Sequence, residues 1–333
     1  MSLPRIAIAT GDPAGIGPEI ALKAALDARV RALCRPLLVG DPAVVEMHAR
    51  AAGLSPQLKF VTKPADADWS NGALNLLDGR DGTNAPVELG KVDAAYGRAS
   101  LAATRRAIKA ALAGEVEAVV AAPQTERSIA AAGVAFDGYP SFVARETGTP
   151  VNDVFLMICF DDKRVVHATL HVSVREALAL ITPERIEHVI RVTDASLRKL
   201  GIAKPKIFVS GLNPHAGEDG LFGRDEIEII QPAIHAAAKL GIDVSGPFGA
   251  DTMFHKKGCD AFIVMLHDQG HIAAKLLAFN RTAGLSIGSP ILFSSVAHGS
   301  AHDIAGKGMA DPGAMIEAIT RLAKVNVSEK QPA

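Results

Sequence analysis

The sequence predicts a doubly wound α/β protein of two domains, and three observations carry that prediction. Short β-branched, apolar runs alternate with helical patterns along the chain, which is the order found in open parallel sheets. Most of these runs are continuously apolar, as expected of strands covered on both faces. The chain has 333 residues, more than one hydrophobic core usually serves.

Seven apolar runs are predicted strands, and they are spread over the whole chain. In order they are residues 5–10, 36–40, 118–123, 153–160, 206–213, 261–267 and 291–296. Two long helical patterns are residues 95–112, closed by Gly114, and 182–201, which starts at Thr-Pro-Glu and ends at Lys-Leu-Gly. No linker rich in Pro, Gly or Ser is present, so we expect the chain to cross between domains within packed elements.

Composition excludes several classes of partner. The 35 Lys and Arg residues nearly balance 36 Asp and Glu residues, which leaves a net charge of −1 and no basic stripe for nucleic acid. No apolar stretch is long enough to span a bilayer, and the N-terminus lacks a signal-peptide layout. Three scattered cysteines without a C-x-x-C pair fit a reducing compartment. We therefore expect a cytoplasmic globular protein that binds neither nucleic acid nor membrane.

The first predicted strand runs into a glycine-rich turn, IAIATGDPAGIGPEIALKA (6–24). Gly11, Gly15 and Gly17 would let the backbone approach a ligand closely, and the helix that follows from Pro18 would present its N-terminus to an anion. The spacing is not G-x-G-x-x-G, and an ordinary tight turn between strand and helix explains it equally well.

Three histidines stand at or beside the ends of predicted strands: His171, His215 and His267. Three neutral imidazoles can hold a borderline divalent metal and leave positions open for substrate oxygens. Without a metal, each would be an ordinary polar group at a strand end. His167 lies four residues before His171 on the same predicted strand face, and we expect it to be structural. The histidines within helical patterns are expected at the surface or in packing: His48, His188 and His235.

The segment MLHDQGHIAAK (265–275) places ionisable groups directly after a predicted buried strand. Open α/β sheets place their chemistry just past the carboxyl ends of the strands. Asp268 and Lys275 are therefore candidates for the site, as is His271, although a merely polar turn would look the same.

A second glycine-rich loop, VAHGSAHDIAGKGMADP (296–312), carries an acidic residue. Such a loop can wrap an adenosine, with the Asp303 carboxylate accepting hydrogen bonds from the ribose hydroxyls. A 2′-phosphate would be repelled there, so Asp303 favours NAD over NADP. A glycine-punctuated loop with a helix cap is the alternative.

Taken together, these stretches resemble the 4-hydroxythreonine-4-phosphate dehydrogenase family, itself related to isocitrate and isopropylmalate dehydrogenases. GDPAGIGPE, GLNPHAGE, MLHDQG with Lys275, and HGSA-x-DIAGKG occur in the family's order along nearly the whole chain. The resemblance implies two α/β/α domains around a cleft, as in isocitrate and isopropylmalate dehydrogenases. The first, on the cofactor side, would comprise about 1–130 plus 295–333. The second, with the metal, the substrate and the dimer contacts, would comprise about 131–294.

The resemblance also implies an obligate homodimer with its active site at the interface, NAD, and a divalent metal. The metal would be zinc, iron, cobalt or manganese, held by His171, His215 and His267. On the cofactor side the matching residues are His298, Gly299, Asp303 and Ile304.

The departures from that family concern its substrate residues. The family's G-H-T-E is here Gly138-Tyr139-Pro140-Ser141, its Asn falls at about Gly284, and its Arg falls at Phe293, while its Lys is retained as Lys275. Replacing Arg by Phe removes a bidentate phosphate clamp, so we expect an unphosphorylated substrate. In these stretches the chain is similar instead to the terephthalate dihydrodiol dehydrogenases of the same superfamily, with Tyr139, Ser141 and Phe293 facing a flat ring.

The expected activity is therefore NAD- and metal-dependent oxidation, with decarboxylation, of a cis-dihydrodiol carboxylate, specifically terephthalate dihydrodiol to protocatechuate. Lys275 would handle a proton or bind a carboxylate, and Asp268 and Asp251 would orient histidines or bind substrate. His271 would belong to the altered pocket or merely pack beside it. The alternatives are a dehydrogenase of 4-hydroxythreonine-4-phosphate or phosphothreonate, and a non-catalytic sensor that binds NAD or a metabolite.

Overall fold

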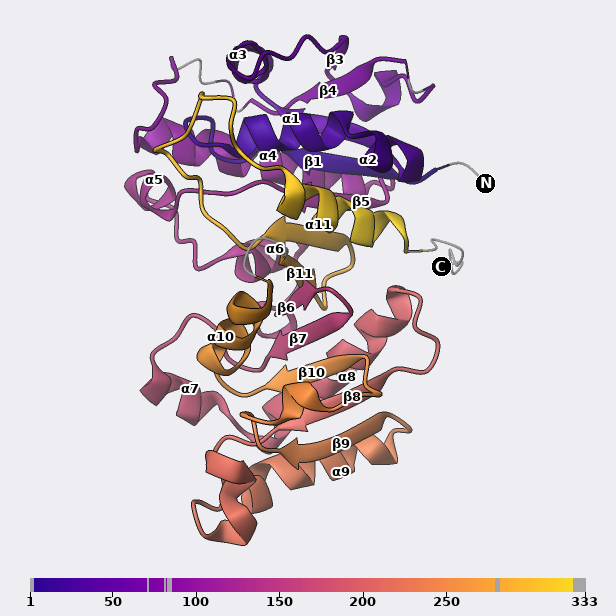
Figure 1. The fold of residues 1–333 in the computed structure, drawn as a ribbon, viewed down its shortest axis with the longest axis vertical. Helices are drawn as coiled ribbons and strands as arrows, with labels where there is room; N and C mark the ends of the chain where they lie inside the picture. Colours follow the sequence, from indigo (N-terminus) through magenta and orange to yellow (C-terminus); the bar gives the residue numbers. More distant parts are fainter. Residues whose placement is uncertain (1–2, 71, 81, 83–85, 279–281, 326–333) are drawn as a thin grey trace. The chain divides into compact units, whose positions relative to one another are not determined.

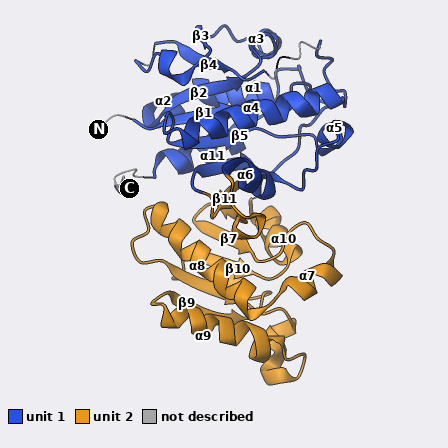
Figure 2. Cartoon of the chain, turned by 180° about the vertical axis from the view of Figure 1, so that it is seen from behind, with its two compact units in different colours: residues 1–147, 290–333 blue, residues 148–289 orange. Residues whose placement is uncertain are grey.

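The computed structural model describes residues 3–70, 72–80, 82, 86–278 and 282–325. The chain divides into two compact units (Figures 1 and 2). Unit 1 comprises residues 1–147 and 290–333, and unit 2 comprises residues 148–289. Both are α/β, so the predicted fold class is confirmed.

Unit 1 is a parallel sheet with helices packed on it. Its strands in spatial order are β3 (Leu58–Val61), β4 (Leu74–Asp78), β2 (Arg35–Gly40), β1 (Arg5–Ala9), β5 (Ala118–Ala121) and β12 (Leu292–Val296). Its helices are α1 (Gly17–Leu26), α2 (Ala28–Leu33), α3 (Pro42–Ala51), the short η1 (Pro64–Asp66), α4 (Ala94–Leu112), α5 (Glu126–Ala131), α6 (Tyr139–Thr147) and α11 (Gly313–Ala323). Helices α5 and α6 pack on α4, whereas α1, α2 and α11 pack on one another.

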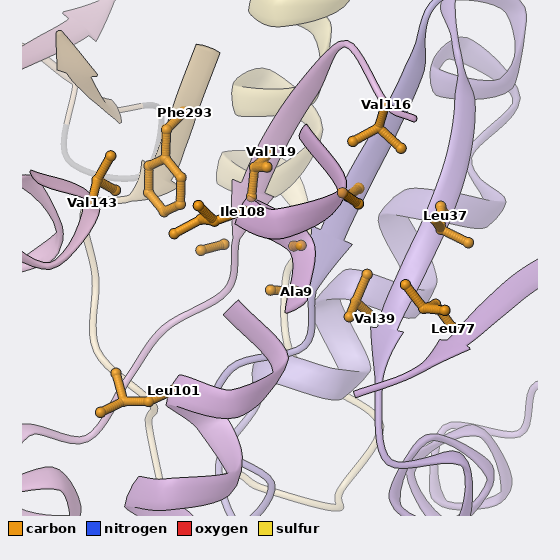
Figure 3. Packing of buried hydrophobic residues seen from close by; sticks show 14 of the residues in the cluster. Ala9, Leu37, Val39, Leu77, Leu101, Ile108, Val116, Val119, Val143 and Phe293 are labelled. Carbon is orange, nitrogen blue, oxygen red and sulfur yellow. The ribbon is translucent and has the colours of Figure 1, made fainter. Parts of the chain in front are cut away.

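The core of unit 1 lies between the sheet and α4. Ile108 of α4 and Val119 of β5 are fully buried there, and Phe293 of β12 packs in the same cluster (Figure 3). Small and β-branched side chains fill much of this layer, and both faces of the sheet are covered.

Unit 2 is a mixed sheet. Its strands in spatial order are β11 (Ala283–Ile287), β6 (Phe155–Phe160), β7 (Lys163–His167), β10 (Ala261–Val264), β8 (Lys206–Ser210) and β9 (Asp243–Phe248). From β7 to β9 the pairs are parallel, whereas β6 runs antiparallel to both β7 and β11. Its helical segments are η2 (Val151–Asp153), α7 (Val174–Leu180), α8 (Pro183–Lys199), η3 (Pro214–Gly220), η4 (Glu226–Ile230), α9 (Gln231–Lys239), η5 (Met253–His255) and α10 (His267–Ala278).

The division between the units differs from the predicted one at both boundaries. The segment 131–147 was expected in the second domain, but α6 buries Phe142 and Val143 in the core of unit 1. Arg105 of α4 also forms an ion pair with Glu146 at 2.9 Å, which ties α6 to unit 1. At the second boundary β12 begins at Leu292 and pairs with β5, so the chain has returned to unit 1 before residue 295.

No helix in the described part of the chain combines the length and the apolar character needed to cross a membrane.

Candidate functional site

The three candidate metal histidines lie at one edge of the unit 2 sheet. Strands β7, β10 and β8 are parallel neighbours, so their carboxyl ends share that edge. His171 follows β7, His267 begins α10 directly after β10, and His215 lies in η3 after β8. The predicted placement of His167 and His171 on one strand is wrong, because β7 ends at His167 and His171 lies in the connection to α7.

His267 and His171 are the two candidate ligands that the structure brings close together. Their ring centroids are 5.7 Å apart. His267 Nδ1 lies 2.6 Å from Asp268 Oδ1, and a carboxylate oxygen only accepts hydrogen bonds, so Nδ1 carries the proton. In the neutral ring His267 Nε2 then has a free lone pair, which is the arrangement that metal-binding histidines need.

His215 is held by an unusual stretch of backbone. Five consecutive residues, His215 to Asp219, have positive φ angles between 43° and 81°, a left-handed path that is costly for residues other than glycine. The buried Glu226 carboxylate fixes the start of this path, because it accepts hydrogen bonds from the backbone amides of Leu212 and Asn213 at 2.8 and 2.7 Å. The His215 imidazole is exposed, with Nδ1 3.9 Å from Asp251 Oδ2.

The imidazoles of His171, His215 and His267 are chemically suited to a divalent metal and lie at the same edge of the sheet. The three side chains do not, however, converge on one point. Imidazoles backed by carboxylates, as in the His267–Asp268 pair, are typical of zinc and related ions. Among the residues that the structure describes, no three His, Cys, Asp or Glu side chains converge as a formed metal site. His171 and His267 are adjacent, and His215 would have to approach them.

Helix α10 carries the other candidates of this edge on one face. His267, His271 and Lys275 are spaced four residues apart and therefore lie in one row along the helix. Lys275 is exposed, and the pKa of His271 is lowered to about 4, first by burial and then by neighbouring positive charge, which includes that of Lys275. His271 itself stacks on His267 and contacts His167.

In unit 1 the glycine-rich turn packs against the glycine-rich loop. A Cβ on Gly15 would lie 2.6 Å from Ser300 Cβ, and the Ile16 amide donates to the Ser300 carbonyl at 2.9 Å. Glu19, buried at the start of α1, accepts from the Ala310 amide at 2.9 Å and pairs with Lys23 at 2.7 Å. The glycine at 15 therefore lets two backbone segments approach each other.

A polar cluster fastens the same two segments. The Asp12 carboxylate, only 1% exposed, accepts a hydrogen bond from the Thr125 hydroxyl and another from His302 Nε2 at 3.0 Å. Thr125 Oγ1 also lies 2.8 Å from Ser300 Oγ. The sequence reasoning did not single out His302 or Thr125. The only signal for His302 was a second histidine in HGSAHD, just before Asp303.

The predicted cofactor residues belong to the glycine-rich loop at residues 296–312, which this polar cluster holds in place. His298 Nδ1 lies 3.1 Å from the Gly299 carbonyl, and nothing lies within 4 Å of where a Cβ on Gly299 would be. Asp303 is exposed and Ile304 is half-buried. An exposed carboxylate on a loop held at its base is sterically free to meet a ribose.

The predicted substrate residues of unit 1 are placed largely by packing. Phe293 is 1% exposed in the core, and its ring lies 5.1 Å from that of Tyr139. The Tyr139 hydroxyl donates to the Ala122 carbonyl at 2.7 Å, and burial raises the pKa of Tyr139. Ser141 is buried and donates to the Asp137 carboxylate near the start of α6. Contact of these three side chains with a substrate stays a prediction.

Comparisons with known proteins match almost the entire chain. Residues 32–322 match the family described as pyridoxal phosphate biosynthetic protein PdxA. A Symbiobacterium thermophilum protein provisionally named D-threonate 4-phosphate dehydrogenase is 41% identical over 95% of both chains. The 1,2-dihydroxy-3,5-cyclohexadiene-1,4-dicarboxylate dehydrogenase of a Comamonas species is 40% identical over 96% of both chains.

Solved structures give the same two groups of relatives. The 4-hydroxythreonine-4-phosphate dehydrogenase of Klebsiella pneumoniae has a TM-score of 0.86 at 36% identity, over 97% of this chain and 99% of that one. The terephthalate 1,2-cis-dihydrodiol dehydrogenase of Burkholderia xenovorans LB400 has a TM-score of 0.69 at 42% identity, over 96% and 98% of the chains.

Proposed function

The chain belongs to the pyridoxal phosphate biosynthetic protein PdxA family and is an oxidoreductase acting on a CH–OH group, and we propose that its substrate is a cis-dihydrodiol carboxylate. In the proposed reaction terephthalate dihydrodiol is oxidised by NAD and decarboxylated to protocatechuate. Two relatives named as dehydrogenases of such a diol, at 40% and 42% identity, support the substrate class.

The observation that carries the proposal is the identity of residue 293. Where the resemblance places a phosphate-binding Arg, this chain has Phe293, packed in the core of unit 1 against Tyr139. A buried phenyl ring can neither donate a hydrogen bond nor carry a charge, so it cannot replace a bidentate clamp on a phosphate. An unphosphorylated substrate does not need that clamp.

We propose that unit 1 binds NAD through its fastened loop. The exposed Asp303 carboxylate would accept from the ribose hydroxyls, with His298, Gly299 and Ile304 around it. The Asp12–Thr125–His302 cluster would hold the loop in place.

Unit 2 would hold a divalent metal through His171, His215 and His267. A bound divalent ion supplies Lewis-acid polarisation of the substrate hydroxyl, and NAD supplies the hydride acceptor. Asp268 keeps the His267 proton on Nδ1. Asp251, near His215 Nδ1, would accept a hydrogen bond from that nitrogen in the same way. Zinc, iron, cobalt and manganese all suit such donors.

Lys275 is the proposed proton-handling or carboxylate-binding group of this chain. It is exposed on the α10 face that also carries His267, so its amine can reach a substrate held there. Loss of hydride from the secondary carbinol beside the carboxyl-bearing carbon gives a β-keto acid. The carboxylate then leaves as CO₂, and the electron pair of the broken C–C bond forms the enolate that completes the aromatic ring and takes up a proton on oxygen.

A homodimer is proposed from the apolar surface of unit 2. Val174 and Leu178 of α7 and Ile272, Leu276 and Leu277 of α10 are all exposed, with Leu276 reaching 81%. Both helices lie on the same side of unit 2 in Figures 1 and 2. Exposed apolar side chains gathered in this way are typical of a protein–protein interface.

A second candidate function is supported by one comparison. The chain is 41% identical to a protein provisionally named D-threonate 4-phosphate dehydrogenase and 40% identical to the diol dehydrogenase. Overall identity therefore favours a phosphorylated hydroxy acid as strongly as it favours the diol.

The test is NADH formation by the metal-loaded protein with each substrate in turn: the diol dicarboxylate, 4-hydroxythreonine 4-phosphate and D-threonate 4-phosphate. We expect turnover of the diol alone. Turnover of only a phosphate ester would contradict the proposal and establish the second candidate function.

A further inference from the structure

Two histidines of unit 2 that the proposed reaction does not use contact each other beneath α10. His167 ends β7 and is 2% exposed, and His271 lies one turn into α10. His167 Nε2 is 3.1 Å from His271 Nδ1, and His167 Nδ1 is 3.4 Å from the Leu156 carbonyl oxygen. The pair joins residues 104 positions apart in the sequence.

The partners of the two rings determine where their protons sit. The Leu156 carbonyl can only accept, so His167 Nδ1 carries the hydrogen. His167 is only 2% exposed, and burial favours the neutral ring, in which Nε2 is an acceptor. His271 Nδ1 must therefore donate to it. The His267 carbonyl, 3.3 Å from the same His271 nitrogen, is also an acceptor and requires the same tautomer.

His271 presents the face of its ring to His267. The two ring centroids are 3.7 Å apart and the rings are inclined by only 11°. A metal ion lies close to the plane of an imidazole that binds it, so two parallel stacked rings cannot both bind one ion. His271 therefore supports the His267 ring, while Asp268 holds its Nδ1 edge.

The sequence of α10 accommodates this arrangement at Gly270. A Cβ there would lie 2.4 Å from His167 Nε2 and 2.9 Å from Val165 Cγ1. Glycine is unfavourable inside a helix because it loses the most backbone freedom. Its presence between His267 and His271 is explained by the close approach of α10 to the buried His167 ring.

We propose that the His167–His271 pair is a positioning device that fixes the His267 ring so that Nε2 faces a divalent ion. The inference rests on the proposed function, in which His267 is a metal ligand. His167 and His271 touch neither substrate nor metal, so they are positioning residues that act through His267.

The tautomers can be measured without any metal. Long-range ¹H–¹⁵N correlation spectra of the metal-free, full-length protein distinguish a proton on Nδ1 from one on Nε2. We expect both His167 and His271 to carry it on Nδ1. A proton on Nε2 of His167 would break the chain of donors and overturn the inference.

The metal is tested by titrating Co²⁺ and following its visible absorption, which reports both affinity and ligand geometry. His271→Ala, which removes donor and ring, should weaken Co²⁺ binding about tenfold or more and alter the spectrum, the effect typical of groups that orient a ligand. His271→Phe keeps a ring to stack and His271→Asn keeps a donor near Nδ1, so each should restore part of the affinity.

Two further variants separate the inference from the proposed function. His235→Ala, on the exposed side of α9, is the matched control and should leave Co²⁺ affinity unchanged. If His267→Ala abolishes binding while a folded His271→Ala binds as the wild type does, the positioning role is overturned and the metal site stands. If His267→Ala also binds normally, the metal site and the inference fail together.

Discussion

At the residue scale, the buried Asp12 carboxylate holds the turn after β1 and the glycine-rich loop together through hydrogen bonds. Its Oδ1 accepts from the Ala14 amide at 2.9 Å, while Oδ2 accepts from Thr125 and His302. Three donors offset the cost of burying a charge, and they come from β1's own turn, from the segment after β5 and from the glycine-rich loop. The loop that carries Asp303 is thus fixed by residues that need not touch a cofactor.

Replacing His302 by Ala should therefore act on both stability and cofactor binding. We expect a loss of about 1–3 kcal/mol in the free energy of unfolding, because the buried Asp12 loses a hydrogen-bond donor. The KM for NAD should rise as the loop loosens, and His302→Gln, which can still donate, should recover part of both losses. Urea unfolding and initial-rate kinetics measure the two effects; an unchanged KM for NAD would contradict the role of the cluster.

His48 supplies a pH dependence in unit 1. It is buried on α3, its Nε2 donates to the Pro13 carbonyl at 3.0 Å, and burial lowers its pKa. Below about pH 6.5 His48 is protonated in the unfolded chain but stays neutral in the folded protein. The free energy of unfolding therefore falls as the pH falls below that value.

In His48→Gln the side chain takes up no proton in either state, but its amide can still donate a hydrogen bond to the Pro13 carbonyl. The free energy of unfolding of this variant should decline less steeply between about pH 7 and about pH 5, by up to about 1.4 kcal/mol per pH unit. Urea titrations at a series of pH values give the two slopes. Parallel slopes would show that His48 titrates alike in both states.

At the scale of elements, each apolar run predicted as a strand is a strand, because a run buried on both faces has an unmistakable pattern. Two of the strands without a prediction lack that pattern: β3 (LKFV) has two exposed residues, and β9 (DVSGPF) contains Gly and Pro and is only half-buried. The common sheet edge of His171, His215 and His267 could be predicted from strand ends. The His167–His271 contact could not, since it depends on the β7–β10 register and on how closely α10 approaches at Gly270.

Gly15 tests the packing of the turn against the loop. In Gly15→Ala the new methyl group would meet Ser300, which should cost about 1–3 kcal/mol of unfolding free energy through overpacking. Gly299→Ala, in the same loop but with open space around its Cβ, is the matched control and should change stability by less than about 0.5 kcal/mol. Equal effects in thermal or urea unfolding would mean that the close approach to Ser300 is not what requires a glycine.

At the scale of the whole molecule, the apolar surface on α7 and α10 predicts self-association. Sedimentation equilibrium should give the mass of a dimer, and Leu276→Glu should shift it towards the monomer by placing a charge in the interface. Leu240→Glu changes another exposed leucine, at the end of α9, and should leave the dimer intact. A monomeric wild type, or equal effects of the two variants, would refute the proposed interface.

We propose that this oxidoreductase couples hydride transfer to decarboxylation of a dihydrodiol ring. The most direct measurement is the yield of products when the metal-loaded protein consumes a limiting amount of terephthalate dihydrodiol with excess NAD. We expect NADH, CO₂ and protocatechuate in equal amounts. NADH without CO₂, or no NADH from the diol alongside NADH from D-threonate 4-phosphate, would contradict it.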